Sequence, residues 1–133
     1  MRAVAGTTKS GRILLCDPRP DGRDGIHAVL SASGHQVERC TDGEALIESA
    51  IANPPALVVY RLRPDAAADL AVLQLLRRVA RDTPLILLAS EGSVATRLSV
   101  HGLRPTYFAV APVDEHELEE AVRAALRRRA RAS

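Results

Sequence analysis

The amino-acid sequence predicts a doubly wound α/β domain, in which helices cover both faces of a five-stranded parallel sheet. Short, continuously apolar segments recur along the chain, and such segments are typical of strands buried on both faces. Segments with helical spacing of apolar residues lie between them, bounded by Gly, Pro, Asn and Asp. Five such alternations favour a parallel sheet with right-handed crossovers and with sites at the carboxyl ends of the strands.

The five expected strands are short, and each is followed by a recognisable break. Asp17 and Pro18 follow the first strand, and Arg61 stands at the end of the third. The fourth, Leu-Ile-Leu-Leu-Ala, is the most hydrophobic. The expected strands are residues 13–16, 35–40, 56–60, 85–89 and 107–111.

The expected helices differ in the strength of their signals. The first, residues 21–33, is weakened by two early glycines and ended by Gly34. The second opens at residues 41–44, which have capping-box spacing, and the last, residues 113–129, repeats that spacing from Asp114 to Glu117. The third follows a loop at residues 64–68 and has these apolar positions: Leu70, Leu73, Leu76 and Ala80. The fourth is short, with an expected inner face of Val94, Leu98 and His101.

Composition narrows the class of protein. The 133 residues suffice for one domain, expected at residues 12–130 between a leader at 1–11 and a tail at 131–133. The net charge of +2 does not imply attraction to nucleic acid across the whole domain. Neither a signal peptide nor a membrane span is recognisable, so we expect a cytoplasmic protein of bacterial type.

Chemistry-bearing side chains form no familiar motif. Cys16 and Cys40 fall inside expected strands and are expected to be buried free thiols. The four histidines are widely separated, and no nucleophilic triad or phosphate-binding loop has recognisable spacing. The sequence therefore predicts no enzyme activity, no metal and no cofactor.

Five segments, taken in order, resemble the receiver domain of bacterial response regulators. They are R-I-L-L-C-D-P (12–18), G-H-Q-V-E-R-C-T-D-G-E-A-L (34–46), P-A-L-V-V-Y-R (55–61), P-L-I-L-L-A-S (84–90) and A-P-V-D-E-H-E-L (111–118). The resemblance covers residues 11–129. It implies a flavodoxin-like fold of strand order 2-1-3-4-5 and a place in two-component signalling, or phosphorelay.

The resemblance also implies an altered acceptor pocket. Receivers of this family hold Mg²⁺ with two acids, accept phosphoryl on an Asp, and use a hydroxyl residue and a Lys before a proline. The six corresponding positions hold, in order, Asp17, Pro18, Arg61, Ala89, Ala111 and Pro112. Only the first acid and the proline match the family pattern. Because a guanidinium has no lone pair for phosphorus, the chain is expected to be a non-catalytic pseudo-receiver.

Several alternatives remain open for this pocket. Arg61 is hypothesised to reach the carboxylate of Asp17 or of Asp65, or else to point into solvent. Metal is not expected, because Asp17 alone offers too few oxygen ligands. The vacated pocket could instead serve a small-molecule sensor, given a cavity with apolar walls near Asp17, Ala89 and Ala111. The last alternative is a receiver phosphorylated at a displaced acid such as Asp65.

A protein partner in a bacterial signalling pathway is the expected ligand. Receivers usually signal through a face made by the fourth helix, fifth strand and fifth helix, where a homodimer could also form. Phe108 matches the family's aromatic switch position, or is simply part of the core. No aromatic residues accompany the arginines near the C-terminus, so nucleic-acid binding by this domain alone is not expected. The candidate face comprises Val94, Arg97, His101, Tyr107, Glu115, Glu119 and Arg123.

Overall fold

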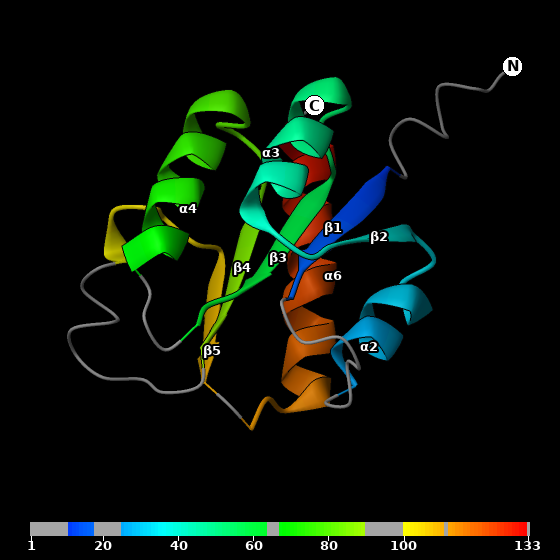
Figure 1. Ribbon diagram of the computed structural model, residues 1–133. Helices are drawn as coiled ribbons and strands as arrows, with labels where there is room; N and C mark the ends of the chain where they lie inside the picture. The colour runs from blue at the N-terminus through cyan, green and yellow to red at the C-terminus, as the bar shows by residue number, and fades with distance from the viewer. Residues whose placement is uncertain (1–10, 18–24, 64–66, 90–99, 111, 133) are drawn as a thin grey trace, which may run out of the picture.

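A five-stranded parallel sheet forms the centre of the molecule (Figure 1). The computed structural model describes residues 11–17, 25–63, 67–89, 100–110 and 112–132, and of residues 67 and 128–132 it describes only the backbone. The strand order is β2-β1-β3-β4-β5, which confirms the expected topology. The elements are β1 (Arg12–Cys16), α2 (Ile26–Ala32), β2 (Gln36–Cys40), α3 (Gly43–Ala52), β3 (Leu57–Arg61), α4 (Ala67–Val79), β4 (Leu85–Ala89), β5 (Tyr107–Val110) and α6 (Glu115–Ala132).

Successive residues of a strand point to opposite faces of the sheet, so these apolar strands place apolar side chains on both faces. A helix layer covers each face. Leu14 and Cys16 belong to the apolar cluster that includes the inner faces of α3 and α4. Ile13 and Leu15 belong to the cluster that includes the inner faces of α2 and α6. All five residues of β3 and all five of β4 are buried, as their apolar runs predict for every position except Arg61.

Helix starts differ from the expected ones where backbone conformation or capping decides them. The first described helix, α2, begins only at Ile26, because Gly25 has a φ of 80° and cannot belong to a right-handed helix. Asp42, and not Thr41, caps α3: its Oδ1 accepts a hydrogen bond of 2.8 Å from the backbone N–H of Ala45. The helix after β3 begins at Ala67, earlier than expected.

The last helix is longer than expected at its C-terminal end. Asp114 caps α6 by accepting a 3.0 Å hydrogen bond from the backbone N–H of Glu117, as the spacing predicts. The helix then continues to Ala132 instead of ending at residue 129. The added residues are Ala and Arg, which favour helix, and no glycine or proline interrupts them.

Some sequence expectations concern residues that the structure does not describe. These are the leader at 1–10, the start of the first expected helix at 21–24 and residues 90–99 of the fourth. Of the fourth helix, only Val100 and His101 are described. Val100 is buried and His101 is exposed, so the expectation of an inward His101 is wrong, because the neighbouring aliphatic side chain takes the buried place.

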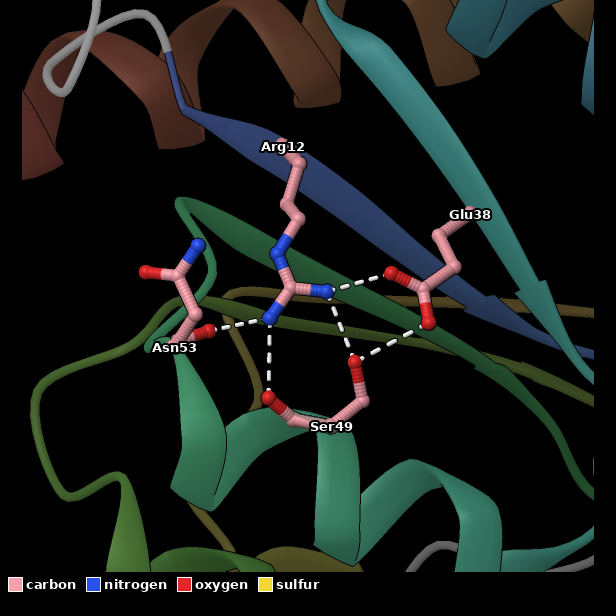
Figure 2. A network of polar contacts seen from close by, with 4 residues as sticks. All are labelled: Arg12, Glu38, Ser49 and Asn53. Carbon is pink, nitrogen blue, oxygen red and sulfur yellow. Dashed lines mark hydrogen bonds and ion pairs between the residues drawn. The ribbon is translucent and has the colours of Figure 1, made fainter.

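A partly buried arginine joins the first two strands to α3 at the amino end of β1 (Figure 2). Arg12 Nη1 binds Glu38 Oε1 and lies 2.7 Å from Ser49 Oγ. Its Nη2 donates to the carbonyl oxygens of Ser49, at 2.8 Å, and of Asn53. Ser49 Oγ in turn donates to Glu38 Oε2 at 3.0 Å. The guanidinium therefore donates hydrogen bonds to carbonyl groups at the C-terminal end of α3. The sequence did not reveal this role.

Close contact between α3 and α4 gives a first prediction. A Cβ on Gly43 would lie 2.5 Å from Val72 Cγ2, and valine is a short, stiff side chain that yields little. We expect Gly43→Ala to lower the free energy of unfolding by about 1–3 kcal/mol, measured by urea denaturation. Gly102→Ala is the control, because no described atom lies within 4 Å of its Cβ position. Equal stability of the two variants would contradict the steric explanation.

Candidate functional site

The carboxyl ends of the three central strands bring three of the expected pocket residues together. Cys16 pairs with Tyr60 across β1 and β3, and Arg61 pairs with Leu88 across β3 and β4. Asp17, Arg61 and Ala89 therefore lie at one edge of the sheet. All three are buried, with 2%, 7% and 3% of their surface exposed.

Arg61 and Asp17 form a buried ion pair. Arg61 Nε donates to Asp17 Oδ2 at 3.2 Å, and the two side chains are 8% and 2% exposed. The hypothesis that Arg61 reaches Asp17 is thus confirmed, and the alternative that it points into solvent is wrong. Asp65 lies outside the described residues. The pair joins the end of β1 to the end of β3. Burial of either charge without the other would carry a large desolvation free energy.

A second buried carboxylate, which the sequence did not reveal, lies beside the first. Asp69, in the first turn of α4, accepts a 2.7 Å hydrogen bond from Tyr60 Oη. It also accepts from the backbone N–H and from Nη2 of Arg63, both at 2.8 Å. Donors from Tyr60 in β3 and from Arg63, just after it, thus hold the start of α4. An acidic residue at a helix start, six residues after an arginine, is too common a pattern to have predicted this cluster.

These contacts set the ionisation of the cluster. Burial by itself raises the pKa of Asp69, but the hydrogen bonds from Arg63 and Tyr60 outweigh it and hold that pKa below its usual value. Burial, with the hydrogen bond to Asp69, raises the pKa of Tyr60. Asp69 is therefore an ionised carboxylate whose oxygens are both occupied.

The two cysteines are buried neighbours on adjacent strands. Cys16 pairs in register with Cys40, and both are free thiols, which confirms the sequence prediction. Burial, reinforced by Cys40 and nearby carboxylates, raises the pKa of Cys16 to about 12. Such a thiol is protonated near neutral pH and is a poor nucleophile.

The cavity beside Arg61 is small and lined mostly by polar residues. Its volume is about 60 Å³, and its lining includes Thr41, Asp42, Arg61, Arg63 and Asp69. This space suits a few water molecules, whereas ligand pockets usually measure hundreds of cubic ångströms. Within the described residues, it does not match the apolar-walled cavity that a small-molecule sensor would need near Asp17.

The described residues do not fit the Mg²⁺ that the resemblance implies. Magnesium requires about six oxygen ligands in near-ideal octahedral geometry. Asp17 is paired with Arg61, and the described part of the chain contains no group of three His, Cys, Asp or Glu that could hold a metal. Pro18 and Ala111 lie outside the described residues, and Pro112 is exposed.

The candidate interaction face is divided between two sides of α6. Tyr107 Oη donates to Glu117 Oε1 at 3.2 Å, so Glu117 marks the side of α6 nearer β5. Glu115 approaches Gly25 at the start of α2, on the other side. Helical spacing thus puts Glu115 and Glu117 on different sides of α6, and whether the candidate residues form one interface stays a prediction. His101 is exposed, and Val94 and Arg97 lie outside the described residues.

A groove lies between α2 and α6 on that other side. Its volume is about 420 Å³, and Val29, Val122 and Leu126 contribute apolar lining. Glu119 and Arg123 line it as an exposed ion pair of 3.4 Å. Phe108, on the opposite sheet face, is partly buried and packs against the cluster beneath α3 and α4.

Solved structures share this architecture. The receiver domain protein (CheY-like) of Methanospirillum hungatei superposes with a TM-score of 0.81 over 92% of this chain and 98% of that one, at 16% identity. The chemotaxis protein CheY4 of Vibrio cholerae superposes with a TM-score of 0.74 over 86% of this chain and 98% of its own, at 17% identity. At these identities the likeness concerns the fold.

Sequence relatives point to the same class of domain. The response regulator protein PmrA of Pseudomonas aeruginosa is 32% identical over 117 residues, which are 88% of this chain and 53% of PmrA. The probable transcriptional regulator ycf27 of Cyanophora paradoxa is also 32% identical, over 88% of this chain and 48% of its own length. Together, these relatives and solved structures support a CheY-like receiver domain for this chain. No protein-family model matches it.

The receiver domain spans about half the length of the curated relatives that it matches. Their descriptions as transcriptional and response regulators therefore apply to longer proteins. Among the described helices of this receiver domain, none is long and apolar enough to cross a membrane.

The buried ion pair leads to a stability prediction. We expect Arg61→Met to lower the free energy of unfolding by about 3 kcal/mol, because it leaves the Asp17 carboxylate buried without its guanidinium. The double variant Arg61→Met/Asp17→Asn should recover at least half of that loss, since the uncompensated charge is gone. Urea denaturation of the wild type and of Asp17→Asn completes the cycle. Strictly additive effects would show that the pair is not coupled.

The depressed pKa of Asp69 predicts how stability depends on pH. The folded state holds its proton less tightly than the unfolded chain, so this stabilisation is present above the unfolded pKa of about 4 and is lost as pH falls through the lower folded pKa. At pH 7, Asp69→Asn should lower the free energy of unfolding by about 2 kcal/mol. The difference from wild type should shrink on acidification. A difference that is constant with pH would refute the assignment.

Proposed function

We propose that this chain is a pseudo-receiver, which binds a protein partner in a signalling pathway without accepting a phosphoryl group on aspartate. The observation that carries the proposal is the buried ion pair of Arg61 with Asp17. The resemblance to receivers puts Arg61 at the acceptor position and Asp17 at the first metal-binding acid. One contact therefore involves both positions on which the phosphorylation chemistry depends.

The chemistry of each group supports this proposal. Phosphoryl transfer to a receiver needs a carboxylate nucleophile, whereas a guanidinium stays protonated and offers no lone pair. It also needs a cation to neutralise charge on the transferred group. In this chain the Asp17 carboxylate already has a cationic partner, and Ala89 has no hydroxyl with which to bind phosphate.

The second buried acid at this edge, Asp69, gives little support to phosphorylation at a displaced residue. Asp69 is 1% exposed, and both of its carboxylate oxygens accept hydrogen bonds. An attack on phosphorus would require these bonds to break first. The small polar cavity beside Arg61 likewise gives little support to a small-molecule sensor.

The partner-binding role rests on surfaces away from this edge. The α2–α6 groove has apolar lining and the charged residues Glu119 and Arg123, a combination typical of protein interfaces. We assign the partner to this groove and to the neighbouring exposed side of α6. The fixed ion pair would hold the sheet edge in one arrangement, so that binding needs no phosphoryl switch.

The test is an amide NMR titration of the full chain with Mg²⁺ and then beryllofluoride, which mimics a bound phosphoryl group. We expect no saturable shift in the signals of Cys16, Tyr60 or Arg61. The positive control is a phosphorylatable receiver domain titrated under the same conditions. Saturable shifts at these residues that extend to Phe108 and α6 would show a surviving phosphorylation switch and overturn the proposal.

A further inference from the structure

Three large apolar side chains stay exposed in the described part of the chain, and all three lie on the outer helix layer formed by α3 and α4. Ile51 of α3 is 61% exposed, and Leu75 and Val79 of α4 are 45% and 39% exposed. Single exposed aliphatic groups are normal on a protein surface, but a cluster of them marks an interaction site. These three side chains mark an interaction site if they lie side by side.

Helix packing brings Ile51 and Val79 to one end of the layer. Figure 1 shows α3 and α4 side by side, and the two helices are in contact. The Cβ position of Gly43 lies 2.5 Å from Val72 Cγ2, so these residues mark the same height on the two helices. Ile51 comes eight residues after Gly43 and Val79 seven after Val72, which places both about 11–12 Å further along.

Helical spacing places the same residues on the facing sides of α3 and α4. Val72, Leu75 and Val79 recur at intervals of three and four residues, so they form one stripe on α4. The contact of Val72 with the Gly43 position directs that stripe toward α3. Ile51 lies two turns after Gly43, on the α4 side of α3. The three exposed side chains thus form one apolar strip, named here the α3–α4 strip.

Opposite charges flank the α3–α4 strip. Glu48 lies midway between Leu46 and Ala50, which face the sheet, so its side chain points outward from α3. Arg78 follows the sheet-facing Leu76 by two residues and points outward from α4 in the same way. Both are exposed, and neither has an ion-pair partner within the described residues. One helix therefore presents an acid and the other a base on the same surface.

We propose that the chain forms a homodimer through this surface, with the α3–α4 strip of one copy packed on that of a second. A two-fold axis parallel to the helices lays α3 of each copy over α4 of the other. Glu48 comes five residues after Gly43 and Arg78 six after Val72, so their heights differ by about 1.5 Å. The axis therefore sets each Glu48 opposite Arg78 of the partner subunit, and each Ile51 opposite Val79 of the partner subunit.

This charge arrangement favours a second copy as the occupant. A two-fold rotation places the acidic residue of each copy opposite the basic residue of the other. The same surface is therefore complementary to itself, and two equivalent ion pairs form. The apolar strip is small compared with a standard interface of about 1,600 Å². We therefore expect weak association, with a dissociation constant of about 10 μM to 1 mM. The dimer would leave the α2–α6 groove free, on the other face of the sheet.

Sedimentation equilibrium of the full chain, from about 10 μM to about 1 mM, tests the proposal. Glu48→Arg alone and Arg78→Glu alone should each raise the dissociation constant roughly tenfold, because like charges then face each other at two symmetric places. The double variant Glu48→Arg/Arg78→Glu restores opposite charges and should return the constant to within about twofold of wild type. All substituted positions are exposed, and thermal unfolding of each variant checks that it is folded.

A matched control uses the exposed pair Glu119 and Arg123 of α6. Reversal of either charge there should leave the dissociation constant unchanged. The proposal is overturned if the wild type is monomeric up to the highest concentration, if the double variant fails to restore association, or if the α6 reversals dissociate the dimer instead. None of these outcomes depends on whether the chain accepts a phosphoryl group.

Discussion

The central strands are buried on both faces, and this constraint governs how the charged groups at their carboxyl ends are held. Every residue of β3 is buried up to and including Arg61. A guanidinium in such a place needs a carboxylate, because an unpaired buried charge carries a heavy desolvation cost. Asp17, at the end of β1, supplies that carboxylate. Two residues beyond Arg61, the same logic pairs Arg63 with the buried Asp69 and fixes the start of α4.

These pairs decide which groups the carboxylates at the sheet edge contact. Two carboxylates lie there, but each is paired with an arginine, and the cavity beside Arg61 admits little more than water. The groove and the exposed apolar strip described above lie on the two helix layers, away from that edge. The α2–α6 layer carries a groove with a charged pair, whereas the α3–α4 layer carries an apolar strip with opposite charges on its two helices. The two proposed binding surfaces therefore lie on opposite faces of the sheet.

Much of the fold was predictable from local pattern, because a strand buried on both faces must be apolar throughout. Leu85–Ala89 is a strand with the predicted bounds, and β3 differs by a single residue at each end. Helix starts were less predictable: Gly25 excludes itself from α2 by a positive φ, and Asp42 takes the capping role expected of Thr41. The exact start of a helix depends on a single backbone angle or on one hydrogen bond. Several neighbouring residues in the sequence could provide that angle or that bond.

At the site, sequence alone determined that Asp17, Arg61 and Ala89 share one edge, because parallel strands end on the same side of their sheet. It left open which carboxylate Arg61 would meet, and tertiary structure selected Asp17, since the packing of β1 against β3 sets that distance. Sequence also gave no sign of the Asp69 cluster or of the Arg12 network, whose partners are brought together only when helices and loops pack. Periodicity specifies which face a residue takes. Only packing specifies which polar group it meets there.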